Sequence, residues 1–319
     1  MGSPYSAFSH RFNFSGAQQS KIIRVIWRRI GGNMTKQTRK LTTIVTGRAT
    51  SDGAGVKLKR IIHQQHQKAF DPFLLLDEFA SDNAADYIGG FPSHPHRGFE
   101  TVTYMLEGAM LHRDHLGNEG HLRAGDVQWM TAAHGIIHSE MPEQENGLLR
   151  GFQLWINLPA KEKMKPPHYQ DIAAADIPRL SLANGGYIKV IAGDYVSDTE
   201  TVTGAVTGVT TQPLYLDVSL SPQQTLNIPI AAEHTVLVYV YQGDALVGAA
   251  ADIIAAGQLG QLENGDNLQL TSQQQAARFL VLAASPLHEP IVQSGPFVMN
   301  SVEEVEQAFR DYRDGVLTL

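Results

Sequence analysis

The chain has 319 residues, enough for about two domains, and its 43% hydrophobic and 18% charged residues are an ordinary balance for a globular protein. It contains no cysteine, which excludes disulfides, thiolate nucleophiles, iron–sulfur clusters and thiolate zinc sites, and which fits a reducing cytosol. The formal net charge of −7 gives no general attraction to nucleic acid, and no long apolar stretch predicts a membrane span.

The first 33 residues differ from the rest because they contain five basic residues, several serines and no acidic residue. This composition resembles an organelle transit peptide, and the first six residues fit the loose pattern for N-myristoylation. We favour a disordered extension over residues 1–40, or a start assigned too far upstream, with Met34 as the natural initiator. We expect a cytoplasmic protein, with organelle targeting as the open alternative. No basic patch occurs outside residues 1–48, so we expect no direct nucleic-acid binding.

From Leu41 onward the sequence predicts short strands separated by Gly, Asn, Asp and Pro turns. Apolar and β-branched residues recur in runs with the two-residue period of a strand. Many such strands, with no alternation of strands and helices, are typical of an all-β barrel or sandwich. The predicted strands are 41–46, 56–62, 73–79, 101–106, 110–113, 127–130, 149–158, 187–192, 214–220, 236–241 and 279–283.

The second half of the chain repeats features of the first, which indicates a duplicated barrel. The turn 120–126 matches 260–266 at a spacing of 140 positions, and the strand that begins at Arg150 matches the one that begins at Arg278. We therefore predict two tandem barrels. The expected boundaries are a basic extension at 1–40, barrels at 41–165 and 181–290, a linker at 166–180 and a tail at 291–319.

The tail contains the clearest helix signal. Ser301 and Glu304 form a capping box, and Gly315 can end the helix. We expect its apolar stripe to pack on a barrel wall and to carry no chemistry. The stripe consists of Val302, Val305, Phe309 and Tyr312.

Two pairs of residues in the stretch 91–142 point to a metal site. His94 and His96 lie two positions apart, as do His138 and Glu140. Residues i and i+2 of a strand point to the same face, so two such strands facing each other across a barrel bring four ligands together. Three imidazole nitrogens and one carboxylate oxygen suit Fe(II), Mn, Ni, Cu or Zn.

The second half of the chain lacks these pairs. Opposite the first pair the repeat offers residues 231–234, and opposite the second it offers Arg278 and Leu280. We therefore expect one metal-binding barrel, in the N-terminal half, and one metal-free barrel.

Four motifs, at 94–102, 125–130, 135–142 and 295–300, together resemble the signatures of the pirin family, two-barrel members of the cupin superfamily. The resemblance covers about residue 40 to the C-terminus. It implies two cupin barrels, of the double-stranded β-helix or jelly-roll type, followed by a short C-terminal helix. It also implies one mononuclear metal ion, usually iron, with Co, Mn, Ni, Cu and Zn as the other compatible metals. The implied ligands are His94, His96, His138 and Glu140.

The resemblance also bears on neighbouring residues. Glu100 follows the first pair, where the general cupin pattern has a ligand, but in pirins the carboxylate follows the third histidine, so we place Glu100 outside the ligand set. His134 departs from the family pattern and is a candidate to reach the site or to line its approach. His112 and His115 lie near a turn, and we expect them to be solvated strand-end residues.

A further set of residues consists of candidates for the pocket around the metal. For the apolar ones a place in the core is an equal alternative, and the arginine has the alternative of pairing with a carboxylate. With His134, the candidates are Phe91, Arg97, Phe99, Met105 and Trp129.

Two classes of function follow from the resemblance. The first is a metal-dependent dioxygenase of the quercetin 2,3-dioxygenase type, which opens the ring of a flavonol or catechol-like substrate with O2 and releases CO. Fe(II) would act as Lewis acid and template, and Glu140 is the candidate catalytic base. The alternative is an iron-dependent, redox-sensing regulator that binds a transcription factor or a metabolic enzyme.

Overall fold

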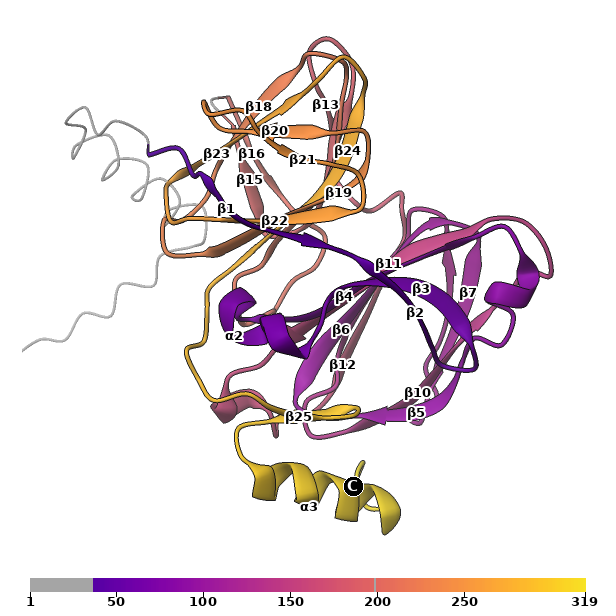
Figure 1. Cartoon of the computed structure of the whole chain (residues 1–319). Helices are drawn as coiled ribbons and strands as arrows, with labels where there is room; N and C mark the ends of the chain where they lie inside the picture. The colour runs from indigo at the N-terminus through magenta and orange to yellow at the C-terminus, as the bar shows by residue number, and fades with distance from the viewer. Residues whose placement is uncertain (1–36, 198) are drawn as a thin grey trace, which may run out of the picture. The chain divides into compact units, whose positions relative to one another are not determined.

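Two barrels, each made of a seven-stranded and a four-stranded sheet, account for most of the chain (Figure 1). The structure, a computed structural model, describes residues 37–319 except residue 198. The predictions made for residues 1–36, including the transit-peptide, acylation and start-site alternatives, lie outside the described residues. Within those residues, no helix has the length and hydropathy needed to cross a bilayer. The predicted all-β architecture of two barrels with a C-terminal helix is confirmed.

The first barrel contains the strands that carry the four predicted ligands. Its large sheet has the order β12-β9-β6-β11-β4-β3-β2, and its small sheet has the order β5-β10-β7-β8. The strands of the large sheet are β2 (Arg48–Asp52), β3 (Val56–Ile62), β4 (Phe73–Ser81), β6 (Phe99–Glu107), β9 (Val127–Thr131), β11 (Leu149–Asn157) and β12 (His168–Ile172). Those of the small sheet are β5 (Phe91–His96), β7 (Ala109–Asp114), β8 (Glu119–Arg123) and β10 (Ile136–Pro142).

The second barrel repeats this topology. Its large sheet has the order β1-β22-β19-β24-β17-β14-β13, and its small sheet has the order β18-β23-β20-β21. The large sheet contains β1 (Leu41–Thr46), β13 (Arg179–Ser181), β14 (Tyr187–Ala192), β17 (Leu214–Leu220), β19 (Thr235–Gln242), β22 (Gln258–Leu262) and β24 (Ala277–Ala284). The small sheet contains β18 (Thr225–Pro229), β20 (Ala245–Val247), β21 (Asp252–Ile254) and β23 (Asn267–Ser272).

The remaining elements are short, apart from the last helix. Two small hairpins, β15 (Asp194–Val196) with β16 (Thr201–Thr203) and β25 (Val292–Ser294) with β26 (Phe297–Met299), lie outside the barrel sheets. Residues 37–319 also contain three single 3₁₀ turns, η1 (Gln64–His66), η2 (Ala84–Asp86) and η3 (Ala160–Glu162), and two α-helices, α2 (Gln67–Phe70) and α3 (Val302–Arg313).

Strands of the two kinds of sheet differ in their sequence pattern because they differ in what they face. Strands β8 and β10 of the small sheet alternate buried and less buried residues, as expected for a sheet with one face toward solvent. Strands β4, β6 and β9 are buried almost throughout. One face of each lines the barrel, while the other packs in a core that residues of both barrels share.

Two tyrosines at matching positions form hydrogen bonds between the barrels. The Tyr104 hydroxyl, from β6, donates to Asp217 Oδ2 at 2.7 Å, and the Tyr239 hydroxyl, from β19, donates to Glu78 Oε2 at 2.6 Å. Tyr104 pairs with β11 and Tyr239 with the equivalent strand β24, so the two bonds are reciprocal. Arg150 also binds Glu78, at 2.7 Å, which completes the neutralisation of that buried carboxylate.

Sheet membership differs from the predicted domain boundaries in three places. Strand β1, expected in the first barrel, pairs with β22 of the second (Figure 1). The expected linker 166–180 contains β12, which pairs with β9 of the first barrel. Arg39, expected in a disordered extension, is fully buried and donates to carbonyls of the second barrel, among them Ala231 at 2.7 Å. An edge strand of each large sheet thus comes from outside the predicted bounds of its barrel: β1 for the second barrel and β12 for the first. Local sequence patterns do not reveal such pairing.

The register of the second barrel corrects the proposed repeat. The counterpart of the Gly125 turn is Gly257, not Gly265, because each amide bonds the end of the preceding long strand: Gly125 to Met105 at 2.9 Å and Gly257 to Val240 at 2.7 Å. Gly120 and Gly260, which anchored the predicted match, lie on β8 and β22, strands of different kinds of sheet.

The true counterparts of the predicted ligands are aliphatic. Leu268 pairs with Ile228 as His138 pairs with His94, and Leu270 occupies the position of Glu140. All three aliphatic residues are buried in the core of the second barrel. The sequence had proposed other residues as counterparts. Of these, 231–234 lie in the loop before β19, and Arg278 and Leu280 lie on β24.

Helix α3 begins as predicted but buries a narrower stripe. Ser301 accepts from the Glu304 amide, and the Glu304 carboxylate accepts from the Ser301 amide, so the capping box is complete. Its buried residues are Val305 and Ala308, whereas Val302 is 56% exposed. The helix packs mainly on the hairpin β25–β26. Ala308 also belongs to a small apolar cluster against which Ile137 of the barrel strand β10 packs.

Candidate metal centre

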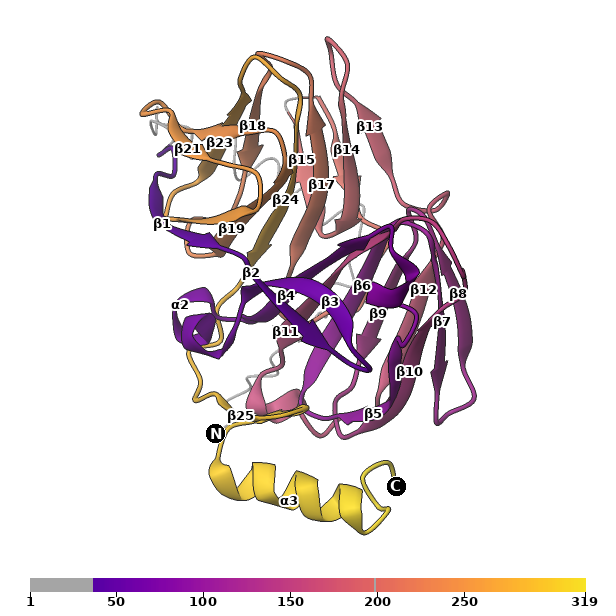
Figure 2. The ribbon, with the colours of Figure 1, turned by 45° about the vertical axis from the view of Figure 1, so that its right-hand side comes forward.

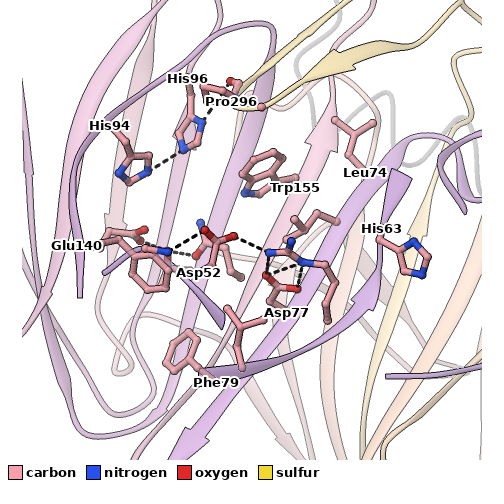
Figure 3. A pocket seen from close by; sticks show the side chains of 18 of the residues that line it. Asp52, His63, Leu74, Asp77, Phe79, His94, His96, Glu140, Trp155 and Pro296 are labelled. Atoms are coloured by element: carbon pink, nitrogen blue, oxygen red, sulfur yellow. Dashed lines mark hydrogen bonds and ion pairs between the residues drawn. The ribbon is translucent and has the colours of Figure 1, made fainter. Parts of the chain in front are cut away.

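Three histidines converge inside the first barrel. His138 on β10 pairs directly with His94 on β5. His96 follows two residues later on the same strand, with its ring beside that of His94 (Figure 3). Ring centroids lie 4.3 Å apart for His94 and His138, 4.7 Å for His94 and His96, and 5.0 Å for His96 and His138. One nitrogen from each ring lies within 4.8 Å of the others. The two-residue spacing and the strand register together produce this convergence.

Backbone carbonyls orient two of these rings. His94 Nδ1 lies 2.8 Å from the Pro92 carbonyl, and His96 Nδ1 lies 3.4 Å from the Pro296 carbonyl. A ring that donates from Nδ1 carries no proton on Nε2. The two Nε2 atoms are 3.1 Å apart, so their lone pairs face each other.

The third ring has an unpaired nitrogen at the same place. His138 Nε2 is buried and has no hydrogen-bond partner among the described residues. Buried polar atoms are rarely left unpaired. A cation among the three Nε2 atoms satisfies all of them at once. Metal-binding histidines usually donate their other ring N–H to a carbonyl or carboxylate, which orients the ring as the backbone carbonyls do here. These residues therefore fit a metal ion.

Burial favours the neutral form of His96 and His138. It lowers the pKa of His96 and of His138 well below the usual value, and the neighbouring histidines add to the effect. A metal ion needs the unprotonated imidazole, so these two residues are ready to bind at neutral pH without first losing a proton.

Glu140 faces the same pocket but stands apart from the three nitrogens. Its side chain is largely buried, and no carboxylate oxygen belongs to the group within 4.8 Å. Thr103 Oγ1 donates to Glu140 Oε1 at 2.7 Å. Glu100 lies elsewhere in the barrel wall, fully buried, where Thr131 donates to Oε1 at 2.7 Å and burial raises the pKa of the carboxyl.

A pocket of about 810 Å³ opens onto His94 and His96, a size that suits a small organic ligand. Aromatic and aliphatic side chains form much of its wall, and polar groups form a strip along it (Figure 3). The apolar lining residues are Leu58, Leu74, Leu75, Phe79, Phe91, Pro92, Met110, Trp155 and Pro296; the polar ones are Asp52, Arg60, His63, Gln64, Asp77, His94, His96, Thr103, Glu140, Gln153 and Gln293.

Among the apolar residues predicted to line the pocket, the structure places only Phe91 in the wall. Phe99 is buried behind it, against Trp155 at 4.4 Å and His96 at 5.1 Å between ring centroids. Met105 and Trp129 are fully buried in core clusters, the alternative that the sequence left open for them.

Neither Arg97 nor His134 lines the pocket. The Arg97 side chain contacts the C-terminal segment. Arg97 is 4% exposed, forms a 2.6 Å ion pair with Asp311 of α3 and donates to the Leu317 carbonyl at 3.1 Å. It also donates from Nε to the His134 carbonyl. The alternative in which Arg97 pairs with a carboxylate is therefore the one observed.

His112 was misplaced by the sequence prediction. It is fully buried, not solvated, and its Nδ1 lies 3.4 Å from His138 Nδ1. The available signal was its phase: His112 and the buried Met110 occupy the same face of β7. Thr103 and Trp155 were also missed, because neither belongs to a motif.

Both halves of the chain match family models. The model described as Pirin covers residues 55–156, and the model described as Pirin C-terminal cupin domain covers residues 215–318. The chain belongs to the pirin family. The resemblance noted in the sequence is thereby confirmed, and the two barrels are the two cupin domains of a pirin.

Several members of the family are similar over nearly their whole length. The chain is 55% identical over 282 residues to a Pseudomonas aeruginosa protein provisionally named a quercetin 2,3-dioxygenase, covering 88% of this chain and 99% of that protein. It is 40% identical over 281 residues to human pirin, covering 87% of this chain and 93% of that one. A crystal structure of quercetin 2,3-dioxygenase from Acinetobacter baumannii superposes with a TM-score of 0.81 at 34% identity, covering 88% of this chain and 98% of that one.

Proposed function

We propose that this pirin binds a single metal ion, Fe(II), through His94, His96, His138 and Glu140. The convergence of one nitrogen from each of the three rings, and the lack of a hydrogen-bond partner for His138 Nε2 among the described residues, support the histidine ligands. Glu140 lines the same pocket and offers its second carboxylate oxygen, since Thr103 occupies only Oε1. Iron rests on the family resemblance, because the donor set also suits Mn, Co, Ni, Cu and Zn.

We further propose that the protein is a dioxygenase that opens a flavonol-type aromatic ring with O2 and releases CO. The names of similar proteins in Pseudomonas and Acinetobacter support this choice. The observation that carries it is that His94 and His96, which converge with His138, lie in the wall of an aromatic-lined pocket of about 810 Å³.

The residues of the chain have separable roles in this reaction. Bound Fe(II) would supply Lewis acidity and a template for the two reactants. Glu140 accepts the proton of the substrate hydroxyl, and Thr103 holds its carboxylate toward the pocket. Trp155 and Phe79 contribute flat surface against which a planar aromatic ring can pack (Figure 3).

The test is O2 consumption by protein reconstituted with Fe(II) in the presence of quercetin. We expect quercetin-dependent O2 uptake with CO release by the wild type and none by His94→Ala. His121→Ala is the matched control, because His121 is an exposed histidine on β8 that pairs with Glu143 outside the pocket. Tight iron retention without any turnover would contradict the dioxygenase proposal and favour the iron-dependent regulator.

A further inference from the structure

An arginine held by two carboxylates forms part of the pocket wall. Arg60 on β3 binds Asp77 on β4 through Nε, at 2.9 Å to Oδ1, and through Nη2, at 2.7 Å to Oδ2. Arg60 Nη2 also donates to Asp52 Oδ2 at 2.7 Å. We call Asp52, Arg60 and Asp77 the charged cluster. All three residues line the same pocket as His94 and His96.

The charged cluster lies away from the histidines along the pocket. In Figure 3 Asp52 and Asp77 stand between Glu140 and His63, with Trp155 on one side of them and Phe79 on the other. A flat molecule whose one end reaches the histidines therefore presents its other end to this cluster.

The turn that carries Asp52 has a fixed position. Gly53 adopts a positive φ of 56°, and a Cβ there would come within 2.5 Å of the Gly90 carbonyl oxygen. The next amide, of Ala54, donates to that same carbonyl at 2.9 Å. The β2–β3 hairpin is thus seated on the loop before β5, and Asp52 is held at the pocket although its side chain is 55% exposed.

The charged cluster has both hydrogen-bond donors and hydrogen-bond acceptors that are not used within the protein. No acceptor among the described residues binds Arg60 Nη1, whose two N–H groups stay available. Asp52 accepts from Arg60 and from the Gly53 amide, which leaves part of its four-site acceptor capacity open. Adjacent donors and acceptors of this kind match a hydroxyl, which both donates and accepts.

The charge of the cluster limits what can bind there. Two carboxylates face one guanidinium, so the cluster has a net negative charge when all three groups are ionised. Burial raises the pKa of Asp77 to about 6, which still leaves that carboxylate mainly ionised at neutral pH. A carboxylate, sulfate or phosphate on the substrate would meet repulsion from Asp52, whereas a neutral phenol would not.

We propose that the charged cluster determines substrate specificity by binding a phenolic hydroxyl at the end of the substrate away from the metal. The substrate class is a neutral, flat aromatic with a metal-binding oxygen pair at one end and a hydroxyl at the other. This inference rests on the proposed function only for the end of the substrate that binds the metal. At the other end, Asp52 and Arg60 select among flavonols by the position of their hydroxyl groups.

The test measures binding without turnover, in Fe(II)-loaded protein under anaerobic conditions. The ligands share one chelating group: 3-hydroxyflavone, 3,4′-dihydroxyflavone, 3,7-dihydroxyflavone and 4′-carboxy-3-hydroxyflavone. We expect wild type to bind one of the dihydroxy ligands at least about tenfold more tightly than 3-hydroxyflavone, since hydrogen bonds to charged groups are strong. Asp52→Ala should reduce that ratio to about threefold or less and leave 3-hydroxyflavone binding unchanged, and Asp52→Asn should strengthen binding of the carboxylate.

The matched control is Asp86→Ala, which removes an ion-paired carboxylate that does not line this pocket. An Asp52→Ala protein with the wild-type ratio overturns the inference, as does a wild type that binds no flavonol. Failure of the proposed function looks different: quercetin would bind with the expected preference, but no O2 would be consumed in air. If wild type retains no Fe(II), the same ratios are measured on metal-free protein.

Discussion

The imidazole of His112 lies next to Nδ1 of His138, the ring nitrogen that does not face His94 and His96. For His138 to present an unprotonated Nε2, its Nδ1 must donate, and the only nitrogen within reach among the described residues is His112 Nδ1 at 3.4 Å. Burial lowers the pKa of His112, which keeps the ring neutral and able to accept. His112 therefore favours the tautomer that the proposed metal ligand His138 needs, without itself being a ligand.

Substituting His112 by Leu should weaken metal binding while preserving the fold. The apolar side chain fills the buried site, but it leaves His138 Nδ1 without an acceptor, so we expect metal affinity to fall by about ten- to a hundredfold. Competition against a chelator measures this affinity, with His121→Leu as the control for loss of an imidazole. Equal affinity in the His112 variant and the wild type would show that the tautomer is set in another way.

At the scale of single residues, the sequence predicted what depends on i and i+2 spacing. His94 and His96 share a face because they share a strand, so their pairing was visible in the sequence. The Arg60–Asp77 ion pair was not, because the two residues lie on adjacent strands and meet only through the β3–β4 register. No spacing rule predicts which positions of two strands will align.

Among the elements, the C-terminal hairpin β25–β26 completes the pocket. Pro296, between β25 and β26, lines the pocket and accepts from His96 (Figure 2 shows β25 beside β5). Lys163 holds this segment in place. Its Nζ donates to the carbonyls of Gly98 at 2.7 Å and Val298 at 3.0 Å, and its side chain is 1% exposed.

Lys163 makes the stability of the protein depend on pH. Burial lowers the pKa of its ammonium from 10.5 to about 7. Between these values the unfolded chain binds more protons than the native state, so the free energy of unfolding should rise with pH from about 7 toward 10.5. Below pH 7 the cost of burying the charge is fully present.

Denaturant unfolding of wild type and Lys163→Met measures this dependence. We expect the unfolding free energy of wild type to rise by about 2 kcal/mol relative to the variant between pH 7 and pH 9. The variant lacks this titrating group and otherwise contains the same ones. A difference between the two proteins that stays constant or shrinks over this range would show that Lys163 is not the source.

Elements with local signals were predicted better than their partners. The capping box placed the start of α3 at the correct residue because both bonds lie within four residues. Strand β1 was also expected from its residues, but its partner β22 lies more than 200 positions away in the second barrel. Pairing of that kind depends on the assembled fold and leaves no trace in a window of neighbouring residues.

For the whole molecule, the duplicated barrel separates scaffold from site. The second barrel places Ile228, Leu268 and Leu270 where the first has His94, His138 and Glu140, and it closes a continuous apolar core around them. At the equivalent positions the first barrel has polar side chains and a pocket in place of an apolar core. The sequence predicted the duplication, and its match of Arg150 with Arg278 holds because the two residues take equivalent positions on β11 and β24. Its match of the turns at 120–126 and 260–266 was wrong, because short turn motifs recur by chance.

The metal content of purified protein tests the central claim most directly. Wild type, His94→Ala and the exposed control His121→Ala are loaded with Fe(II), freed of excess metal and analysed by elemental mass spectrometry. We predict a single bound ion per chain in wild type and in His121→Ala, and none in His94→Ala. A His94→Ala protein that retains as much metal as wild type would contradict the three-histidine centre.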